Sequence, residues 1–436
     1  MNLFKPASWK SLMKLIGAFS STLYHTMHQQ LRNLTASWIS SSNHVLEWNA
    51  VQAKRLEDRI RRQLSERAPL RHPSARVAPH NHKRLTREER NIVSHIKRTV
   101  RNLNRNNITR TTAYERMYSS FPELHWAMLA HLVSRNGGWS MTDLQGDLLP
   151  SIQDGEYRLW TYRTLERCNA LIFQDAYPQL MLYTMSRKYG RSLFHLLPYF
   201  DVSSFMLPFW ESFWIQQNSP LLTIALIINE QNVIEGRVVQ NDVYRKHVID
   251  RKDFALHGWL QMNQVIFPAG EPNPSSPVPL YGLTLERFDS LKERISFGKQ
   301  LYTLLFDQPG VHEAVKRFML AVPHTGSRAD YWPHYFTSVR QSKGFNYSAS
   351  RDPSVAHHNN PTIIKLPLYS PKLEEAWSDD RHEPMEPGDW LHRDDVLQYL
   401  YLPQTPRADD VSAAHLLMWE ELHQIAYIAK SSSSEA

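Results

Sequence analysis

Helix start and stop signals recur along this chain, and they constrain its fold more than any other feature. Residues 86–89 (Thr-Arg-Glu-Glu) form a capping box, in which a threonine oxygen and a glutamate carboxylate satisfy free N–H groups at a helix start. The same pattern recurs at 112–115 and 120–123, and Ser140-Met-Thr-Asp143 predicts another start. Asn136-Gly137-Gly138 is typical of a helix stop. These signals predict a chain of successive helices.

The glycine content favours the same fold. Only 15 of 436 residues are glycine, which suits long helices because each glycine costs a helix about 1 kcal/mol. Sustained alternation of apolar and polar residues, the pattern of β-strands, is absent. We therefore expect a mainly α fold, a large multi-helix globular bundle with an irregular, loop-rich region near 344–395 and a short strand at 363–368. Further helices are expected near 156–174, 178–190, 192–198, 203–217, 220–238, 253–266, 283–307, 310–321 and 410–429.

Charge is distributed unevenly along the chain. Residues 1–110 contain 21 lysines and arginines against 6 acidic residues, a net charge of +15, whereas the remaining residues carry a net charge of −8. This asymmetry predicts a basic N-terminal arm attached to a mildly acidic body. We place the arm and its proline-broken linker at 1–84, a single helical body at 85–430, and a serine-rich tail at 431–436.

The arm contains two amphipathic patterns, at 8–30 and 46–66, where apolar residues recur every three or four positions. An apolar stripe beside lysines suits a helix lying on a membrane surface. A basic segment also binds nucleic acid by displacing its counterions. Alternatively, the stripes pack on the body and the arm's cations pair with the acidic segment 374–395. We therefore expect residues 1–110 to contact nucleic acid or an anionic membrane surface, with packing inside the molecule as the alternative.

Several functional classes lack their usual sequence signals. Cys168 is the only cysteine, so neither an internal disulfide nor a Cys-x-x-Cys zinc pair can form, and a reducing compartment fits best. Glycine-rich phosphate-binding loops and a Gly-x-Ser-x-Gly motif are also absent, so no cofactor is predicted. The short apolar stretch at 11–19 is interrupted by Lys14, and no run is long enough to span a bilayer. We expect a cytoplasmic protein, which the arm could hold at the inner face of the membrane.

The segment Asn106–Asp143 is the densest in residues that could carry chemistry. Its central helix is apolar nearly all round and is therefore predicted to be buried, with His131 and Arg135 one turn apart on it. A buried arginine needs an opposite charge, and Asp143 and Asp147 are the candidates. In one interpretation this is a structural clamp; in the other, these side chains line a pocket where an arginine binds a carboxylate or phosphate. The candidate residues are Thr109, Arg110, His131, Arg135, Asn136 and Asp143.

At this segment the chain resembles a known family. The runs Asn107-Ile-Thr-Arg-Thr and Ala130-His-Leu-Val-Ser-Arg-Asn-Gly-Gly-Trp-Ser-Met-Thr-Asp-Leu144 are similar to the YppC-like proteins of bacilli and their relatives, a domain of unknown function (number 2515). The resemblance extends from about residue 85 onward. It implies a bacterial, cytoplasmic setting, and it implies no activity or catalytic residues.

The acidic segment 374–395 has a net charge of −7 and contains His382 and His392. Carboxylates and imidazoles together can bind a divalent metal ion. Their spacing here matches no H-E-x-x-H or EF-hand pattern, so we expect a solvated acidic loop and no metal site.

Two functions remain open from the sequence. The first is a non-enzymatic helical binding protein, whose body holds a partner or small ligand and whose basic arm contacts an acidic surface. The second is an enzyme of unknown reaction with a polar pocket around His131 and Arg135. A concave cavity lined by these two residues would favour the second, whereas a sealed and fully paired environment would oppose it.

Overall fold

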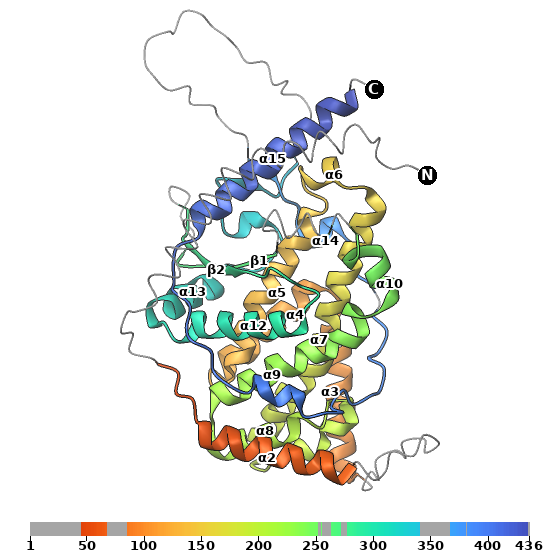
Figure 1. Cartoon of the computed structure of the whole chain (residues 1–436), viewed down its shortest axis with the longest axis vertical. Helices are drawn as coiled ribbons and strands as arrows, with labels where there is room; N and C mark the ends of the chain where they lie inside the picture. The colour runs from red at the N-terminus through yellow and green to blue at the C-terminus, as the bar shows by residue number, and fades with distance from the viewer. Residues whose placement is uncertain are drawn as a thin grey trace, which may run out of the picture.

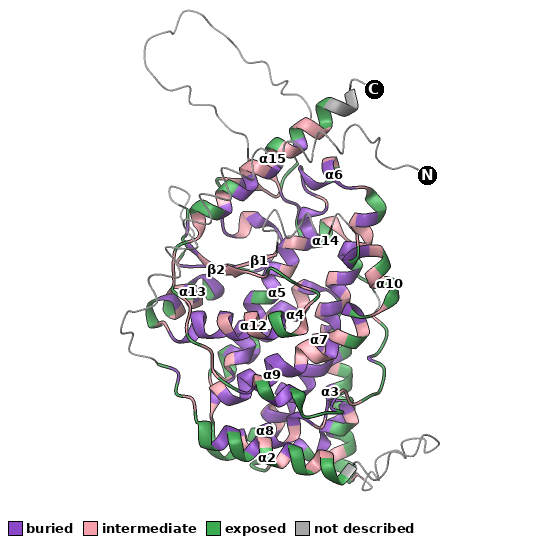
Figure 2. Ribbon diagram, in the orientation of Figure 1, coloured by how far each residue is buried: buried purple, intermediate pink, exposed green. Residues whose placement is uncertain are grey.

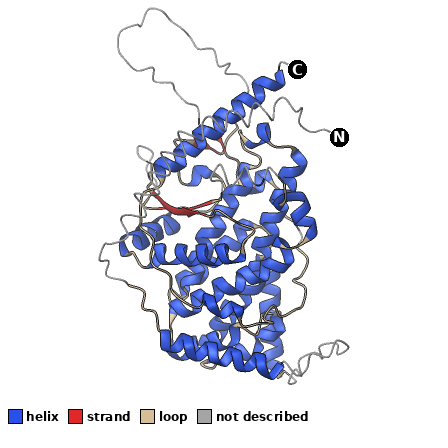
Figure 3. Ribbon diagram, in the orientation of Figure 1, coloured by secondary structure: helices blue, strands red, loops and turns tan. Residues whose placement is uncertain are grey.

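The computed structural model describes residues 45–67, 85–251, 254, 263–271, 277–340, 367–380 and 382–434. Helices dominate these residues (Figure 3). The α-helices are α2 (Ala50–Arg67), α3 (Arg87–Leu103), α4 (Asn107–Ser120), α5 (His125–Asp143), α6 (Leu149–Ile152), α7 (Gly155–Tyr189), α8 (Met206–Gln216), α9 (Ser219–Ile234), α10 (Asp242–Tyr244), α12 (Leu291–Phe306), α13 (Pro309–Ala321), α14 (Leu373–Ala376) and α15 (Ser412–Ser434). The 3-10 and π helices are η2 (Phe194–Phe200), η3 (Glu235–Val239), η4 (Arg245–Ile249), η5 (Arg328–Asp330) and η6 (Asp395–Tyr399).

The described strands form two small sheets. The strands β1 (Gln264–Pro268) and β2 (Leu280–Thr284) pair antiparallel, with Ile266 opposite Gly282. The strands β3 (Phe336–Thr337) and β4 (Leu368–Tyr369) form a two-residue parallel pair. The mainly α fold predicted from the sequence is therefore confirmed.

The helix α5 occupies the centre of the molecule, with α4 and α7 packed along it (Figure 1). The helices α9 and α12 also contact α5, while α2 lies at one end of the long axis and α15 at the other (Figure 1). Buried residues are concentrated along these central helices (Figure 2). The central position of α5 puts its side chains in contact with several different elements.

The end helix α2 is packed against the body. Its residues Ala53, Leu56 and Ile60 are buried in the same apolar cluster as α8 and α9. The preceding backbone is also held, because the N–H groups of Val45 and Leu46 both donate to Asp307 Oδ1, at 2.8 and 3.0 Å. The helix predicted at 46–66 is thus confirmed, whereas the one predicted at 8–30 lies outside the described residues.

The capping box at 86–89 is confirmed, but the four helix boundaries predicted inside the segment that follows are wrong. Asn106, rather than a residue near 112, caps α4, because its side chain accepts a hydrogen bond from the Thr109 N–H group. The chain at 120–123 is a turn between helices, and α5 begins at His125 without a side-chain cap. The residues 136–138 and 140–143 lie inside α5. The glycines there have helical backbone angles and serve close packing, so they do not end the helix.

Two further predictions need correction. The helices predicted at 156–174 and 178–190 are one continuous helix, α7, which contains Pro178 and ends at Gly190 with a positive φ of 65°. The C-terminal end of the helix predicted at 253–266 is the strand β1, whose backbone pairs with β2 and with a side chain of α5. Of the strand predicted at 363–368, residues 363–366 lie outside the described part, and Leu368 begins β4.

A helix that crosses a bilayer needs about 20 mainly apolar residues. Within the described residues, every helix is too short or too polar to cross a bilayer.

Candidate functional site

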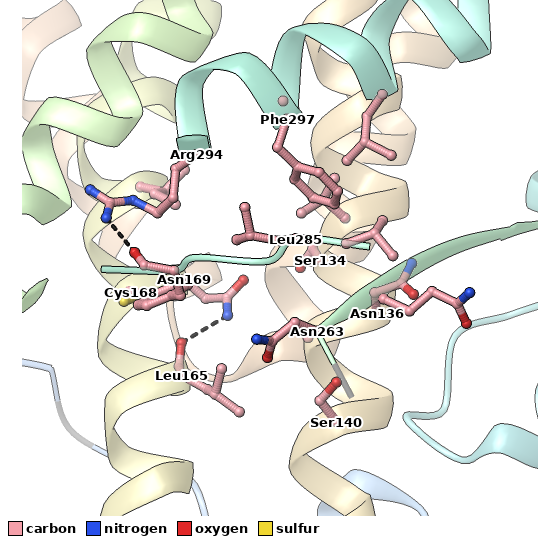
Figure 4. Close-up of a pocket in the computed structure, with 18 of the residues that line it drawn as sticks. Ser134, Asn136, Ser140, Leu165, Cys168, Asn169, Asn263, Leu285, Arg294 and Phe297 are labelled. Atoms are coloured by element: carbon pink, nitrogen blue, oxygen red, sulfur yellow. Dashed lines mark hydrogen bonds between the residues drawn. The ribbon is translucent and has the colours of Figure 1, made fainter. Parts of the chain in front are cut away.

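A cavity of about 290 Å³ lies in the middle of the helical body, between α5, α7, α9 and α12 (Figure 4). The strand β1 and the chain between β2 and α12 complete its wall through Val265 and Leu285. Val133 projects from the central helix α5 and is 38 % exposed, although α5 is surrounded by other elements. This exposure comes from the empty space that the side chain faces.

Small residues on one face of α5 explain why the space is empty. Ala130, Ser134, Gly137 and Ser140 all line the cavity, and their spacing places them along the side that faces α7 and α12. A Cβ atom at Gly137 would lie 3.2 Å from Asn169 Nδ2 on α7. Larger side chains at these positions would fill the cavity.

The lining is mostly apolar, with a few polar groups. Such a surface favours the burial of an apolar ligand, while the polar groups orient it. The apolar residues include Leu129, Leu144, Leu165, Ile172, Ile234, Leu285, Phe288, Phe297 and Leu301.

One polar part of the wall is a buried ion pair between Asp143 and Arg328. The Arg328 Nε atom donates to Asp143 Oδ1 at 2.8 Å, and Nη2 donates to Oδ2 at 2.7 Å. Burial raises the pKa of the Asp143 carboxyl above its ordinary value, and the opposing charge of Arg328 reduces that shift. Each charge therefore compensates the other within the wall.

The ion pair continues into a chain of hydrogen bonds that reaches the cavity again. Arg328 donates to the Tyr331 hydroxyl at 2.7 Å, and that hydroxyl donates to His415 Nε2 at 2.9 Å. Nδ1 of His415 then donates to Gln264 Oε1 at 2.8 Å. Burial and the nearby Arg328 hold the pKa of His415 well below its ordinary value, so the ring is neutral. The chain joins α5, η5, α15 and β1 and fixes the orientation of Gln264.

Glu230 lines another part of the wall, at the C-terminal half of α9. Its carboxylate accepts hydrogen bonds from Trp126 Nε1 at 3.0 Å and from Gln231 Nε2 at 3.2 Å. Burial, with a smaller contribution from the nearby Asp175, raises the pKa of Glu230 to about 8. The group is therefore mainly protonated at neutral pH.

Arg294 of α12 and Cys168 of α7 also line the cavity (Figure 4). Arg294 is ion-paired with Glu235 and donates to Gln231 Oε1 at 2.9 Å. Burial raises the pKa of the Cys168 thiol to about 12. A thiol that stays protonated is a poor nucleophile, so this cysteine behaves as part of the lining.

Two of the six candidate residues predicted from the sequence, Asn136 and Asp143, line the cavity. The Asn136 side chain donates to the Ile266 carbonyl at 2.8 Å and accepts from the Ile266 N–H at 2.9 Å. It therefore acts as a strand partner for β1 and holds that strand on α5. Asp143 belongs to the ion pair with Arg328, so the predicted pairing of Asp143 with Arg135 is wrong.

His131 and Arg135 are on the face of α5 that points away from the cavity. Arg135 is fully buried and donates to the Val322 carbonyl at 2.8 Å, with Asp330 as its carboxylate partner at 3.9 Å. Burial lowers the pKa of Arg135 to about 10. The other predicted partner, Asp147, instead accepts a hydrogen bond from the Tyr369 N–H at 2.7 Å.

His131 is sealed from solvent, and its Nδ1 atom bonds to the Thr111 carbonyl at 2.9 Å. Burial and the charge of Arg135 hold the pKa of His131 well below its ordinary value. Within the described part of the chain, His131 Nε2 and Arg135 Nε have no hydrogen-bond partner. The two residues are thus sealed but not fully paired, and the cavity lies on the opposite side of their helix.

Thr109 and Arg110 hold the start of α4. The Thr109 hydroxyl donates to the Leu103 carbonyl at 2.7 Å, which fixes the turn between α3 and α4. Arg110 is buried in an ion pair with Glu166 at 2.5 Å, and His382 contacts the same carboxylate at 3.0 Å. These contacts tie the acidic segment 374–395 to the core, and they leave Thr109 and Arg110 outside the cavity wall.

Other residues of the acidic segment pair with cations of the basic N-terminal part. Arg105 contacts Asp379 at 2.8 Å, and Arg61 of α2 contacts Asp394 at 3.1 Å. Among the described residues, no three His, Cys, Asp or Glu side chains are grouped closely enough to hold a metal ion.

Most polar residues of the cavity were missed by the sequence reasoning. Arg328, His415 and Arg294 lie in segments with no motif, and their partners are far away in the chain. Glu230 gave one usable signal, because it lies two residues after the mainly apolar run Leu221–Ile228, on the same helix. A carboxylate that continues a fully buried helix face requires an explanation such as a cavity or a partner.

The family model of a protein of unknown function (DUF2515) matches residues 102–421. The chain belongs to this family. It is 46 % identical over 241 residues to the uncharacterized protein YppC of Bacillus subtilis (strain 168), an alignment that covers 55 % of this chain and 73 % of that protein. No solved structure matches the chain. The part matched by the DUF2515 model runs from the last turn of α3 into α15, and it therefore includes almost the whole cavity wall.

Proposed function

We propose that this DUF2515 protein binds a small organic molecule in the cavity beside α5. The observation that carries this proposal is the empty, mainly apolar space of about 290 Å³ at the centre of the body. Interiors of proteins are normally close-packed, so a space of this size lowers stability unless a ligand fills it. Ligand pockets typically have volumes from about 300 Å³ upward, so this cavity is at the lower end of the range. It therefore matches a small ligand better than a drug-sized one.

Binding is better supported than catalysis by the state of the polar groups. Asp143 and Arg294 are each paired with an opposite charge, and the Cys168 thiol is held protonated by burial. A catalytic nucleophile or base needs a reactive protonation state and a free position to reach the substrate. We therefore assign these groups to shaping and orienting the site, and a non-enzymatic binding function to the body.

A neutral fluorescent probe tests the proposal. N-phenyl-1-naphthylamine becomes bright in an apolar site, so the wild-type protein should enhance its fluorescence in a saturable way. Val133→Phe, which adds a ring to the cavity, should weaken that binding about tenfold or more, because one ring removes much of the free volume. The matched control is Val51→Phe, at a valine that is 64 % exposed on α2, and it should leave binding unchanged.

Two outcomes would contradict this function. One is the absence of saturable enhancement with the wild-type protein. The other is equal binding by Val133→Phe and Val51→Phe, which would place the probe outside the cavity.

A second contact is proposed for the basic surface of α2 and α3, namely an acidic surface such as nucleic acid or an anionic membrane. It is supported by a row of exposed cations: Lys54, Arg55, Arg61 and Arg62 on α2, and Arg87, Arg90, Lys97, Arg98 and Arg101 on α3. Two of these cations, Lys54 and Arg61, are ion-paired with Asp58 and Asp394, which reduces the free charge of this surface.

Anisotropy with labelled duplex DNA across a salt series, with anionic vesicles as competitor, measures this contact. Reversing Lys97, Arg98 and Arg101 to Glu should weaken binding and flatten its salt dependence, because fewer counterions are displaced. Reversing the exposed Lys246, Arg287 and Lys292 changes the net charge equally and should have a smaller effect. Equal effects of the two triple variants would contradict a contact at α3.

A further inference from the structure

The charges that line the cavity are unequally compensated. Arg328 is paired with Asp143, and Arg294 is paired with Glu235. Glu230 is the remaining charged group among the described lining residues, and the described part of the chain offers it no cationic partner. The two cations of the cavity wall therefore have anionic partners, whereas the Glu230 carboxyl group has no cationic one. Such a cavity suits a cationic ligand.

The immediate surroundings of Glu230 suit an organic cation in particular. Its hydrogen-bond donors among the described residues, Trp126 Nε1 and Gln231 Nε2, orient the carboxylate without adding charge. A carboxylate can accept about four hydrogen bonds, so acceptor capacity remains for a ligand. Trp126 and Phe297 also line the cavity, and aromatic faces attract ammonium groups.

The remaining lining defines the other half of the ligand. The walls formed by Leu129, Val133, Leu285 and Leu301 offer no charge and few hydrogen-bonding groups. They suit a hydrocarbon or aromatic body rather than a polar one. We infer that the ligand of this cavity is an organic ammonium compound, with an apolar body against α5 and α12 and its positive nitrogen at the Glu230 carboxylate. This inference rests on the proposed binding function and specifies its ligand class.

Binding of a cation at Glu230 changes the protonation of this side chain. With the cavity empty, Glu230 is mainly protonated at pH 7, because burial raises its pKa to about 8. When an ammonium ion binds, the carboxylic acid releases one proton to solvent and the carboxylate pairs with the cation. The other titratable groups that act on Glu230 are Asp175 of α7 and Tyr114 of α4, while Arg294 of α12 is held by Glu235. Affinity for the cation should therefore rise from pH 6 to pH 8.

Three probes of nearly equal shape distinguish cationic, neutral and anionic ligands. They are phenethylamine as its ammonium ion, 2-phenylethanol and phenylacetate. Isothermal titration should show that the full-length protein binds phenethylamine about tenfold more tightly than 2-phenylethanol, because a charge-assisted hydrogen bond replaces a neutral one. At pH 8.5, where most of the Glu230 carboxyl group is ionised, phenylacetate should bind most weakly, since its negative charge repels that of Glu230. Titrations in two buffers of different ionisation enthalpy should reveal proton release with phenethylamine alone.

Two variants assign the preference to Glu230. Glu230→Gln keeps an oxygen that can accept from Trp126, so it should bind 2-phenylethanol as the wild type does and lose the tenfold preference for phenethylamine. Glu230→Asp keeps the charge and should retain part of the preference. Circular dichroism checks that both variants are folded, and the comparison of two ligands within each variant does not depend on its stability.

The possible results test the preference for a cation separately from ligand binding in the cavity. Binding of 2-phenylethanol at least as tight as that of phenethylamine, or a preference that survives in Glu230→Gln, overturns the cation inference and leaves the cavity function in place. If all three probes and the neutral fluorescent probe fail to bind the wild-type protein, both the function and the inference are overturned.

Discussion

Among single residues, Gly138 has the clearest steric requirement in α5. A Cβ atom here would lie 2.4 Å from Asn107 Oδ1 and 2.5 Å from His324 Nε2, and both side chains are buried. We expect Gly138→Ala to destabilise the protein by about 1–3 kcal/mol, since the hydrogen bond between Asn107 and His324 must move. Urea denaturation measures the loss. Gly310→Ala, which meets no atom within 4 Å, is the control and should be neutral or slightly stabilising.

Asp143 allows a second prediction at this scale. Asp143→Asn removes the negative charge that compensates Arg328, and the guanidinium is too deeply buried to be hydrated instead. The expected loss of stability is about 3–5 kcal/mol. The control is Asp394→Asn, which breaks the exposed pair with Arg61 and should cost less than about 1 kcal/mol. Similar losses in both variants would show that burial does not decide the value of the Asp143 pair.

Residue roles were predictable from the sequence where the partner is close in the chain. Thr86 and its partner Glu89 are three residues apart, and the capping box was predicted correctly. Arg328 is 185 residues from Asp143, so no local pattern could relate them. Asn136 was identified as a candidate, but its partner Ile266 is 130 residues away, and its role as a strand partner could not be foreseen.

At the scale of elements, one side chain attaches β1 to α5. Asn136→Ala would leave the N–H and the carbonyl of the buried Ile266 without partners. Each buried unpaired group costs about 1–3 kcal/mol, so we expect a loss of about 2–5 kcal/mol in denaturation experiments. Asn232→Ala, which removes a hydrogen bond to the Ile228 carbonyl within α9, should cost much less because that side chain is half-buried. Faster amide exchange at Ile266 would mark the site of the damage.

Element types were predictable where an apolar stripe and a capping box agree, as in α3. The strand β1 was missed because its run is short and partly buried, and because its partners β2 and Asn136 are not adjacent to it in the chain. The long helix α7 was predicted as two because proline usually ends a helix. Pro178 is buried inside α7, where the packing of the helix on α9 outweighs the lost hydrogen bond.

Packing of α7 against α9 also predicts a pH dependence. Asp175 is fully buried, accepts a hydrogen bond from Gln179 at 2.8 Å, and has its pKa raised to about 7 by burial. The folded protein therefore holds a proton that the unfolded chain releases near pH 4, and stability should fall as the pH rises from about 4 to 7. The slope for one proton is on the order of 1 kcal/mol per pH unit. Denaturation of Asp175→Asn at pH 5 and pH 7 should show a smaller difference than the wild type; an unchanged difference would exclude Asp175 as the source.

At the scale of the whole molecule, the sequence predicted the character of α2 but not its position in the fold. Its helical, amphipathic and basic character was predictable from residues 46–66. The same stripe would serve a helix on a membrane or a helix on the body, because both surfaces bury apolar side chains. The docked position depends on partners far along the chain, such as Ser212, which accepts a hydrogen bond from Gln52 at 2.5 Å. The division of the chain at residue 84 remains a prediction, and the described part of the arm is in contact with the body.

If α2 is integral to the body, a change in its apolar face must destabilise the whole molecule rather than release one helix. Ile60 is fully buried against the main apolar cluster, whereas Val51 on the same helix is 64 % exposed. Ile60→Ala should lower the free energy of unfolding by about 2–5 kcal/mol, and Val51→Ala should change it by less than about 0.5 kcal/mol. Circular dichroism and tryptophan fluorescence should report the same single transition in both variants, because a cooperative unit unfolds as one. A separate early transition in Ile60→Ala would instead show that α2 detaches alone, and that the body is stable without it.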